Sequence, residues 1–145
     1  TDALDFLRTQ RPDVVSYLLT GNTREGARLK LAHFGLDCHF AEGGFSQDAG
    51  DRASIARCAL ATALQRHCVD ADRIFVIGDT PHDIDCGKAI GARTIAVASG
   101  EYTIEELLQD QPWKAVSGIP TPLAFLDLLE LSGQGTDNTS VSTRD

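Results

Sequence analysis

Residues 73–83, R-I-F-V-I-G-D-T-P-H-D, decide the fold of this chain. The first six residues form a short apolar, β-branched run that predicts a buried strand. Pro81 stands at a favoured first-turn position, and residues 81–90 predict a helix that stops at Gly91. Asp79 follows the apolar run directly, where an unpaired carboxylate is costly. This order of strand, acidic turn and helix indicates an α/β unit.

The rest of the chain alternates in the same way. Within each predicted strand, apolar and polar residues do not alternate, so both faces of the strand are expected to be buried. This pattern predicts a doubly wound, Rossmann-like parallel sheet with helices on both faces. We expect one α/β domain over residues 1–131 and a disordered polar tail over residues 132–145. The predicted strands are 14–20, 38–45, 94–98 and 115–117, and the predicted helices are 2–7, 23–34, 53–68, 104–109 and 121–131.

Composition narrows the class of protein. The 145 residues carry 13 Lys and Arg against 21 Asp and Glu, a net charge of −8, which argues against nucleic acid or an anionic membrane as partner. No run approaches the ~20 apolar residues of a membrane span. The four cysteines, at 38, 58, 68 and 86, have no metal-binding spacing. We therefore expect free thiols in a cytoplasmic protein, with Cys58 and Cys68 buried in a helix.

Ligands of open parallel sheets bind at the carboxyl ends of the strands. Thr20, Gly21 and Asn22 end one predicted strand just before a helix, where a hydroxyl, an amide and free N–H groups suit a phosphate. The alternative interpretation is helix capping by Asn22 or Thr23.

Asp79 and Asp83 lie at the end of a second strand and favour a hard cation, Mg²⁺ above all. The alternative is a capping box with Thr80 as N-cap and Asp83 at N3, which explains Asp83 but not Asp79. Arg52 precedes the long helix, where its charge could offset that of a phosphoryl group. Its alternative role is an exposed salt bridge at a helix start.

Together, L-L-T-G-N (18–22), V-I-G-D-T-P-H-D (76–83) and G-K-A-I-G-A (87–92) resemble the haloacid dehalogenase superfamily of phosphohydrolases over residues 1–131. G-G-F-S-Q-D-A-G-D-R (43–52) resembles the basic-motif region of its phosphoglycolate-phosphatase-like members. The resemblance implies that Thr20, with Gly21 and Asn22, binds the phosphoryl group. It further implies that Arg52, or Arg57 in its place, stabilises the phosphoryl charge, and that Asp79 and Asp83 hold Mg²⁺.

The sequence departs from the family in one respect. Family members use an Asp nucleophile in an Asp-x-Asp motif at the end of a central first strand. Nothing upstream of Val14 qualifies, because Asp2 and Asp5 lie in a helical pattern, and the family's cap insertion is missing as well. The absence of Met fits a chain that begins inside a longer protein. Either the central strand comes from another part of that protein, or the two strands beside it close up.

These observations predict the C-terminal part of a Mg²⁺-dependent phosphomonoester hydrolase of a small phosphorylated metabolite, inactive by itself. One alternative is a non-catalytic remnant or regulatory module that binds phosphate or a partner. Another is a metal-independent 2-haloacid dehalogenase, against which Asp79 and Asp83 argue, because uncompensated carboxylates repel an anionic substrate. The substrate and the oligomeric state are not indicated by the sequence.

Overall fold

Short parallel strands alternate with helices along the chain, as predicted. The computed structural model describes residues 1–40 and 42–131, so the predicted disordered tail lies outside the described residues. The elements are α1 (Asp2–Gln10), β1 (Tyr17–Leu19), α2 (Arg24–His33), η1 (Asp37–His39), β2 (Glu42–Gly44), α3 (Arg52–Arg66), η2 (Ala71–Arg73), β3 (Phe75–Gly78), α4 (Pro81–Ala89), β4 (Arg93–Val97), α5 (Ile104–Gln109), β5 (Lys114–Val116) and α6 (Pro122–Leu128).

The strands form two separate parallel sheets. One has the order β1-β2 and the other the order β3-β4-β5. Within the described residues, β1 pairs only with β2 and β3 pairs only with β4. The strands on either side of the expected central strand have therefore not closed up. Each keeps one edge whose N–H and C=O groups have no strand partner.

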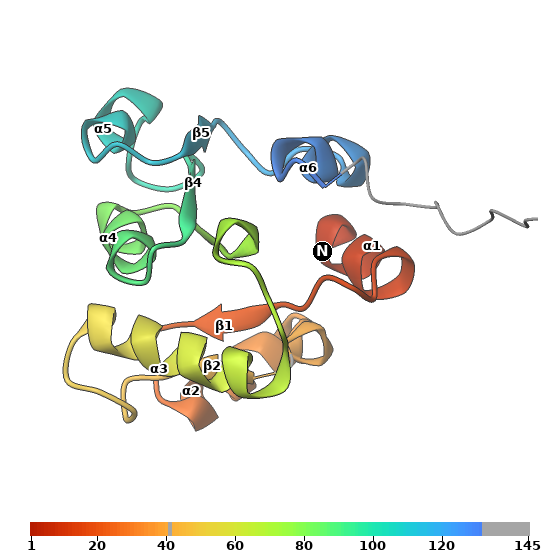
Figure 1. Cartoon of the computed structure of the whole chain (residues 1–145), viewed down its shortest axis with the longest axis vertical. Coiled ribbons are helices and arrows are strands. Elements are labelled where there is room, and N and C mark those ends of the chain that lie inside the picture. Colours follow the sequence, from red (N-terminus) through yellow and green to blue (C-terminus); the bar gives the residue numbers. More distant parts are fainter. Residues whose placement is uncertain (41, 132–145) are drawn as a thin grey trace, which may run out of the picture.

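Helices cover both faces of the three-stranded sheet. Figure 1 shows α4 and α5 on one side of β4 and β5, with α6 and α1 on the other. On the first side, Ile84 and Leu107 pack with Ala96 of β4. On the second side the core lies between α1, β4 and α6 and consists of Leu7, Ile95, Val97, Phe125, Leu126, Leu129 and Leu131. Two apolar faces explain why β4 reads as a continuous apolar run.

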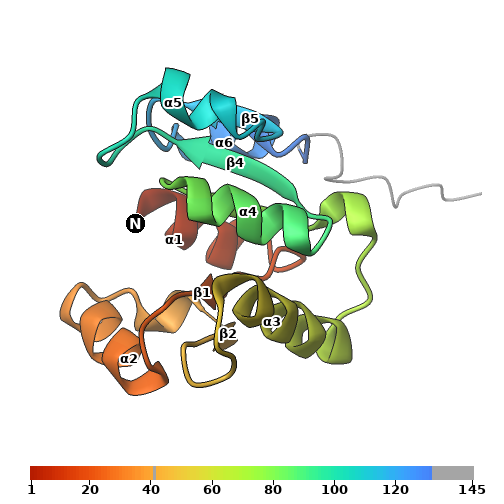
Figure 2. The same ribbon diagram turned by 90° about the vertical axis from the view of Figure 1, so that its left-hand side faces the viewer.

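The two-stranded sheet packs against α3, which runs beside α4 in the view of Figure 2. Gly44 of β2 makes this packing close, because a Cβ built there would lie 2.6 Å from the main-chain oxygen of Ile55 in α3. The pair α3–α4 thereby joins the two sheets and brings the carboxyl end of β1 near the start of α4.

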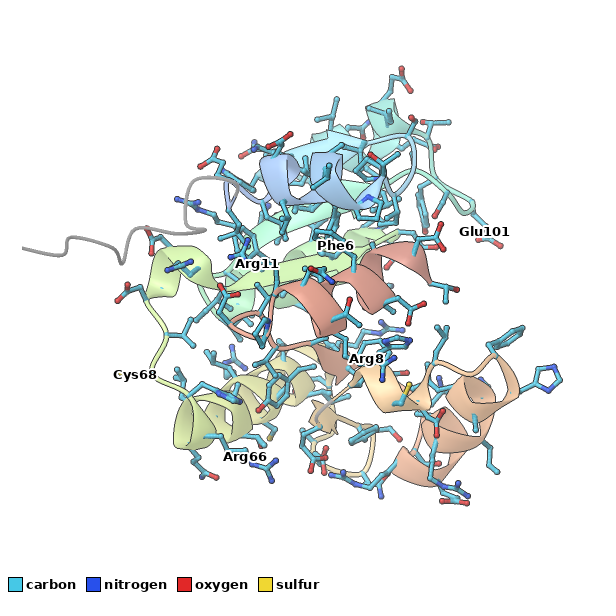
Figure 3. The ribbon with its side chains drawn as sticks, turned by 90° about the vertical axis from the view of Figure 1, so that its right-hand side faces the viewer. Phe6, Arg8, Arg11, Arg66, Cys68 and Glu101 are labelled. Carbon is cyan, nitrogen blue, oxygen red and sulfur yellow. The ribbon has the colours of Figure 1, made fainter. Side chains whose placement is uncertain are left out.

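Some predictions about burial and helix length were wrong. Helix α3 ends at Arg66, so Cys68 lies in the exposed connection to η2 (Figure 3). Cys58 does lie in α3 but is only half-buried. Phe34 is 72% exposed although it shares an apolar face with buried Ala27. Helix α6 ends at Leu128, because Glu130 adopts a positive φ of 58° that a continuing helix does not allow.

The cysteines are free, as expected. Among the described residues, no helix is both long and apolar enough to cross a membrane.

Candidate functional site

The predicted site residues come from the carboxyl ends of β1 and β3 and from the starts of α3 and α4. Thr20 and Gly21, which follow β1, line a shallow pocket together with Arg52 from α3, and this pocket has no room for a water molecule in the present side-chain arrangement. Its lining residues are Leu19, Thr20, Gly21, Arg52, Ile55 and Cys86. The fold thus brings residues 31 positions apart in the chain into one pocket.

Thr20 is oriented by its neighbours in a way that leaves its hydroxyl hydrogen available. Its main-chain N–H donates to the carbonyl of Gly44, which extends the β1–β2 ladder past Leu19. Its Oγ1 accepts hydrogen bonds from the main-chain N–H of Asn22, at 3.1 Å, and from Asn22 Nδ2, at 2.9 Å. Since a hydroxyl that accepts two hydrogen bonds still has its own hydrogen to donate, Thr20 is oriented as a donor to an anion.

Capping at the start of α2 falls to Thr23, not Asn22. Thr23 Oγ1 accepts from the main-chain N–H of Gly26 at 3.2 Å, so the capping alternative is correct for Thr23 alone. Asn22 is instead held by Lys30, whose Nζ donates to Asn22 Oδ1 at 2.9 Å. Sequence reasoning missed Lys30. The available signal was its position on the helix. Lys30 lies four residues after Gly26 and therefore on the same face of α2, and helical side chains tilt toward the start of the helix, where Asn22 lies.

Arg52, and not Arg57, lies next to the other predicted residues. The Arg52 Nη1 atom is 3.8 Å from Asp83 Oδ1, and a Cβ built on Gly21 would lie 3.6 Å from Arg52 Nη2. Arg57 is exposed one and a half turns further along α3. The Ser54 hydroxyl and N–H, which donate to Asp51 at the start of α3, hold the pKa of Asp51 below its ordinary value, and Arg57 adds a smaller effect.

Asp83 has two environments, one for each carboxylate oxygen. Its Oδ2 accepts from the Thr80 N–H at 3.1 Å and from Thr80 Oγ1 at 2.8 Å, which is the capping box that the sequence suggested. Its Oδ1 faces Arg52. The capping interpretation and a ligand role therefore do not exclude each other, because each uses a different oxygen.

Asp79 is exposed, and no hydrogen bond or ion pair joins it to another described residue. Within the described part of the chain, no three His, Cys, Asp or Glu side chains gather closely enough to hold a metal by themselves. A magnesium ion needs only one or two protein carboxylates, because it keeps several of its waters. The donor set of Asp79 and Asp83 therefore fits Mg²⁺ better than a softer metal.

Two further residues, Gly78 and Cys86, shape the site from below. A Cβ on Gly78 would lie 2.3 Å from Asp83 Cβ and Cγ, so only glycine lets α4 begin this close to β3. Cys86 is 2% exposed, and its Sγ donates to the carbonyl of Arg52 at 3.4 Å. Burial raises the pKa of this thiol, and the charge of Asp83 adds to the effect. Cys86 is thus a neutral packing group between α4 and α3.

The fold and the gathering of polar residues at its strand ends define the class, a Rossmann-like α/β protein with a site at the carboxyl edge of its sheets. The family model for haloacid dehalogenase-like hydrolases matches residues 1–88, and a second, HAD-hydrolase-like model matches residues 56–128. The chain belongs to the haloacid dehalogenase-like hydrolase family, which confirms the resemblance noted in its motifs.

Solved structures share the fold at low sequence identity. A predicted phosphatase from Clostridium acetobutylicum is 20% identical, with a TM-score of 0.73 over 89% of this chain and 57% of that one. A haloacid dehalogenase-like hydrolase from Streptococcus pneumoniae is 23% identical, with a TM-score of 0.69 over 88% and 56%. A predicted phosphoglycolate phosphatase from Haemophilus somnus is 18% identical, with a TM-score of 0.69 over 90% and 54%. The chain thus spans a little over half the length of these proteins.

A comparison with curated protein sequences gives no match.

Proposed function

We propose that this chain is the phosphate- and metal-binding part of a Mg²⁺-dependent phosphomonoester hydrolase that acts on a small phosphorylated metabolite. One observation carries the proposal, namely the position of Arg52. It lines the same pocket as Thr20, and its guanidinium lies 3.8 Å from Asp83. A cation that lies beside a hydroxyl donor and beside one of the two candidate metal ligands suits a phosphoryl group that approaches a metal ion.

Each residue has a distinct part in the proposal. Thr20 donates its hydroxyl hydrogen to a phosphoryl oxygen, and Asn22 fixes the orientation of that hydroxyl. Arg52 offsets negative charge on the phosphoryl group. Asp79 and Asp83 would hold Mg²⁺, which would supply charge stabilisation to the transferred group. Cys86 keeps the start of α3, and with it Arg52, against α4.

The nucleophile comes, in this proposal, from a segment outside these 145 residues. Two features support this. The solved relatives are nearly twice as long as the matched region, and β1 and β3 each have an edge without a strand partner in the described structure. The family resemblance implies that a strand carrying Asp-x-Asp lies between them. The 145-residue chain should therefore bind ligands without turning them over.

Calorimetric titration of the chain with Mg²⁺ tests the metal site. We expect binding that weakens about tenfold or more in Asp79→Asn and in Asp83→Asn, because each substitution removes a charged ligand. Asp85→Asn is the matched control, since Asp85 is an exposed carboxylate on the same helix, two residues from Asp83. Absence of Mg²⁺ binding, or equal affinity in Asp79→Asn and Asp85→Asn, would overturn the metal assignment.

Titration with inorganic phosphate tests the anion site. Arg52→Ala should weaken phosphate binding about tenfold, whereas Arg57→Ala should leave it unchanged, because only Arg52 lines the pocket with Thr20. Phosphate binding that does not depend on Mg²⁺ or on Asp79 would favour a regulatory binding module instead. Sustained Mg²⁺-dependent hydrolysis of an aryl phosphate by the purified chain, lost in Asp79→Ala, would contradict the outside nucleophile.

A further inference from the structure

The loop that follows β4 approaches the acidic pair more closely than its sequence suggests. β4 ends at Val97, and the chain turns at once, with the N–H of Ser99 donating to the carbonyl of Val97 at 2.8 Å. This turn places Gly100 against Asp79. A Cβ built on Gly100 would lie 2.7 Å from Asp79 Oδ2 and 3.4 Å from Asp79 Cγ. The first distance is too short for any real side chain, so the two groups compete for one volume.

The contact concerns the carboxylate and not the backbone. Gly100 does not have a positive φ, so an alanine there meets no main-chain strain. The same Cβ would be an ordinary 3.8 Å from Asp79 Cβ. Glu101, the next residue, points away from the body of the molecule (Figure 3). Among the described residues, the end of the Asp79 side chain is therefore the only obstacle to a side chain at position 100.

Nothing else in the described structure holds that carboxylate in place. Asp83 has Thr80 and Arg52 as partners, whereas Asp79 makes no hydrogen bond or ion pair with a described residue. The two glycines beside these carboxylates also differ in what a side chain there would displace. A side chain at position 78 would strike Asp83 Cβ at the start of α4 and disturb the fold. A side chain at position 100 would displace only the carboxylate end of Asp79.

We infer that Gly100 is a positioning residue for the metal ligand Asp79, and that the loop after β4 forms one wall of the metal site. The missing side chain at position 100 leaves room for Asp79 Oδ2 in the rotamer seen here. With alanine at that position the carboxylate must rotate away, which moves a ligand oxygen without unfolding the strand. The inference rests on the proposed role of Asp79 as a ligand of Mg²⁺.

Calorimetric titration of the full chain with Mg²⁺ tests this inference. Gly100→Ala should weaken Mg²⁺ binding by about 2- to 10-fold, because the Asp79 carboxylate, the end of a flexible side chain, must leave its present rotamer. Gly118→Ala is the matched control, because a Cβ there meets nothing within 4 Å, and it should leave the affinity unchanged. Equal affinities of Gly100→Ala and Gly118→Ala would overturn the inference.

The background variant Asp79→Ala separates carboxylate positioning from general damage to the loop. Because Asp79→Ala removes the carboxylate that would be displaced, adding Gly100→Ala should cause no further loss of Mg²⁺ affinity. A second loss of the same size in that background would show that the loop itself is disturbed, and would overturn the inference.

A metal-free measurement distinguishes this inference from the proposed function. In the chain without Mg²⁺, the carboxyl ¹³C resonance of Asp79 should shift in Gly100→Ala and stay in place in Gly118→Ala. If the resonance shifts but the wild-type chain binds no Mg²⁺, the proposed function fails and the contact stands. If the wild type binds Mg²⁺ through Asp79 but the resonance does not shift, the inference fails and the proposed function stands.

Discussion

The two halves of the molecule differ in how deeply their apolar strands β1 and β4 are buried. In the three-stranded sheet, four of the five residues of β4 are buried. In the two-stranded sheet, all three residues of β1 are partly exposed, and α2 buries only Ala27. In the described part of the chain, β4 pairs with a strand on each side, whereas β1 pairs with one strand only. For β1 and β4, burial follows the number of strand neighbours. The edge strand β2 buries Gly43 and Gly44 for another reason, since α3 packs directly against Gly44.

β3 shows the same effect inside the better-packed half. It comes from the most apolar run of the chain, yet Ile77 is 40% exposed because β3 lies at the edge of its sheet. The candidate site spans this boundary. Thr20 comes from the two-stranded half and Asp79 from the three-stranded half, while Arg52 stands at the start of α3, which contacts both β1 and α4.

The largest expected effect is a core truncation in the three-stranded half. Leu107 is fully buried between α5 and the sheet, so Leu107→Ala should lower the free energy of unfolding by about 2–5 kcal/mol. Leu108→Ala, on the same helix at 50% exposure, should change it by less than about 0.5 kcal/mol. Urea unfolding measures both. Similar losses would show that α5 does not pack as described.

Native-state hydrogen exchange tests the difference in stability between the two sheets directly. Main-chain N–H groups of β1 and β2 should exchange about tenfold or more faster than those of β4, because a two-stranded sheet with a thin cover opens locally at lower free energy. Equal protection in both sheets would mean that the chain opens as one unit, and the contrast drawn between them would be wrong.

A smaller loss of unfolding free energy is expected when the N-cap threonine of one helix in each half is replaced by alanine. Thr103 Oγ1 caps α5 within a capping box, and Thr103→Ala should cost about 1 kcal/mol of unfolding free energy. Thr23→Ala, at the start of α2, should cost less, because α2 buries little and its first turn can fray without global unfolding. Thermal unfolding of the two variants measures both losses. A larger loss of unfolding free energy in Thr23→Ala than in Thr103→Ala would contradict this ranking.

The smallest effect concerns acid. Arg11 donates to both carboxylate oxygens of Asp13, at 2.8 and 2.7 Å, and to the carbonyl of Leu131. The hydrogen bond from Arg11 lowers the pKa of Asp13 below its ordinary 3.8. The stabilisation is therefore complete above that ordinary value and is lost as pH falls through the lowered pKa.

Because Asp13 is half-exposed, the pair contributes only about a few tenths of a kcal/mol. Asp13→Asn should flatten the fall in stability below about pH 4 by that amount. Urea midpoints measured from pH 5 down to pH 2.5 check this. Parallel pH curves for wild type and variant would show that the pair adds nothing.

Local signals predicted the order and type of most helices and strands well. The N-cap Thr80 with Pro81 and Asp83 marks the start of α4, and α5 has the predicted bounds because Thr103 begins it within a capping box. The carboxyl-end rule selected Thr20, Asp79 and Asp83 from sequence position alone. Burial was predicted less well. Phe34 and Cys68 are exposed because periodicity gives the face of a helix, not whether another element covers it.

The sequence by itself determined the alternating α/β pattern, the helix caps and the acidic pair, because each depends on residues within one or two turns of each other. Tertiary structure decided which of two arginines stands beside Asp83, that Lys30 holds Asn22, and that Gly100 lies against Asp79. These contacts depend on how α3, α4 and the loop after β4 pack in space. They arise because side chains from segments far apart in the sequence share a limited space, and a local sequence pattern does not indicate which distant segments meet.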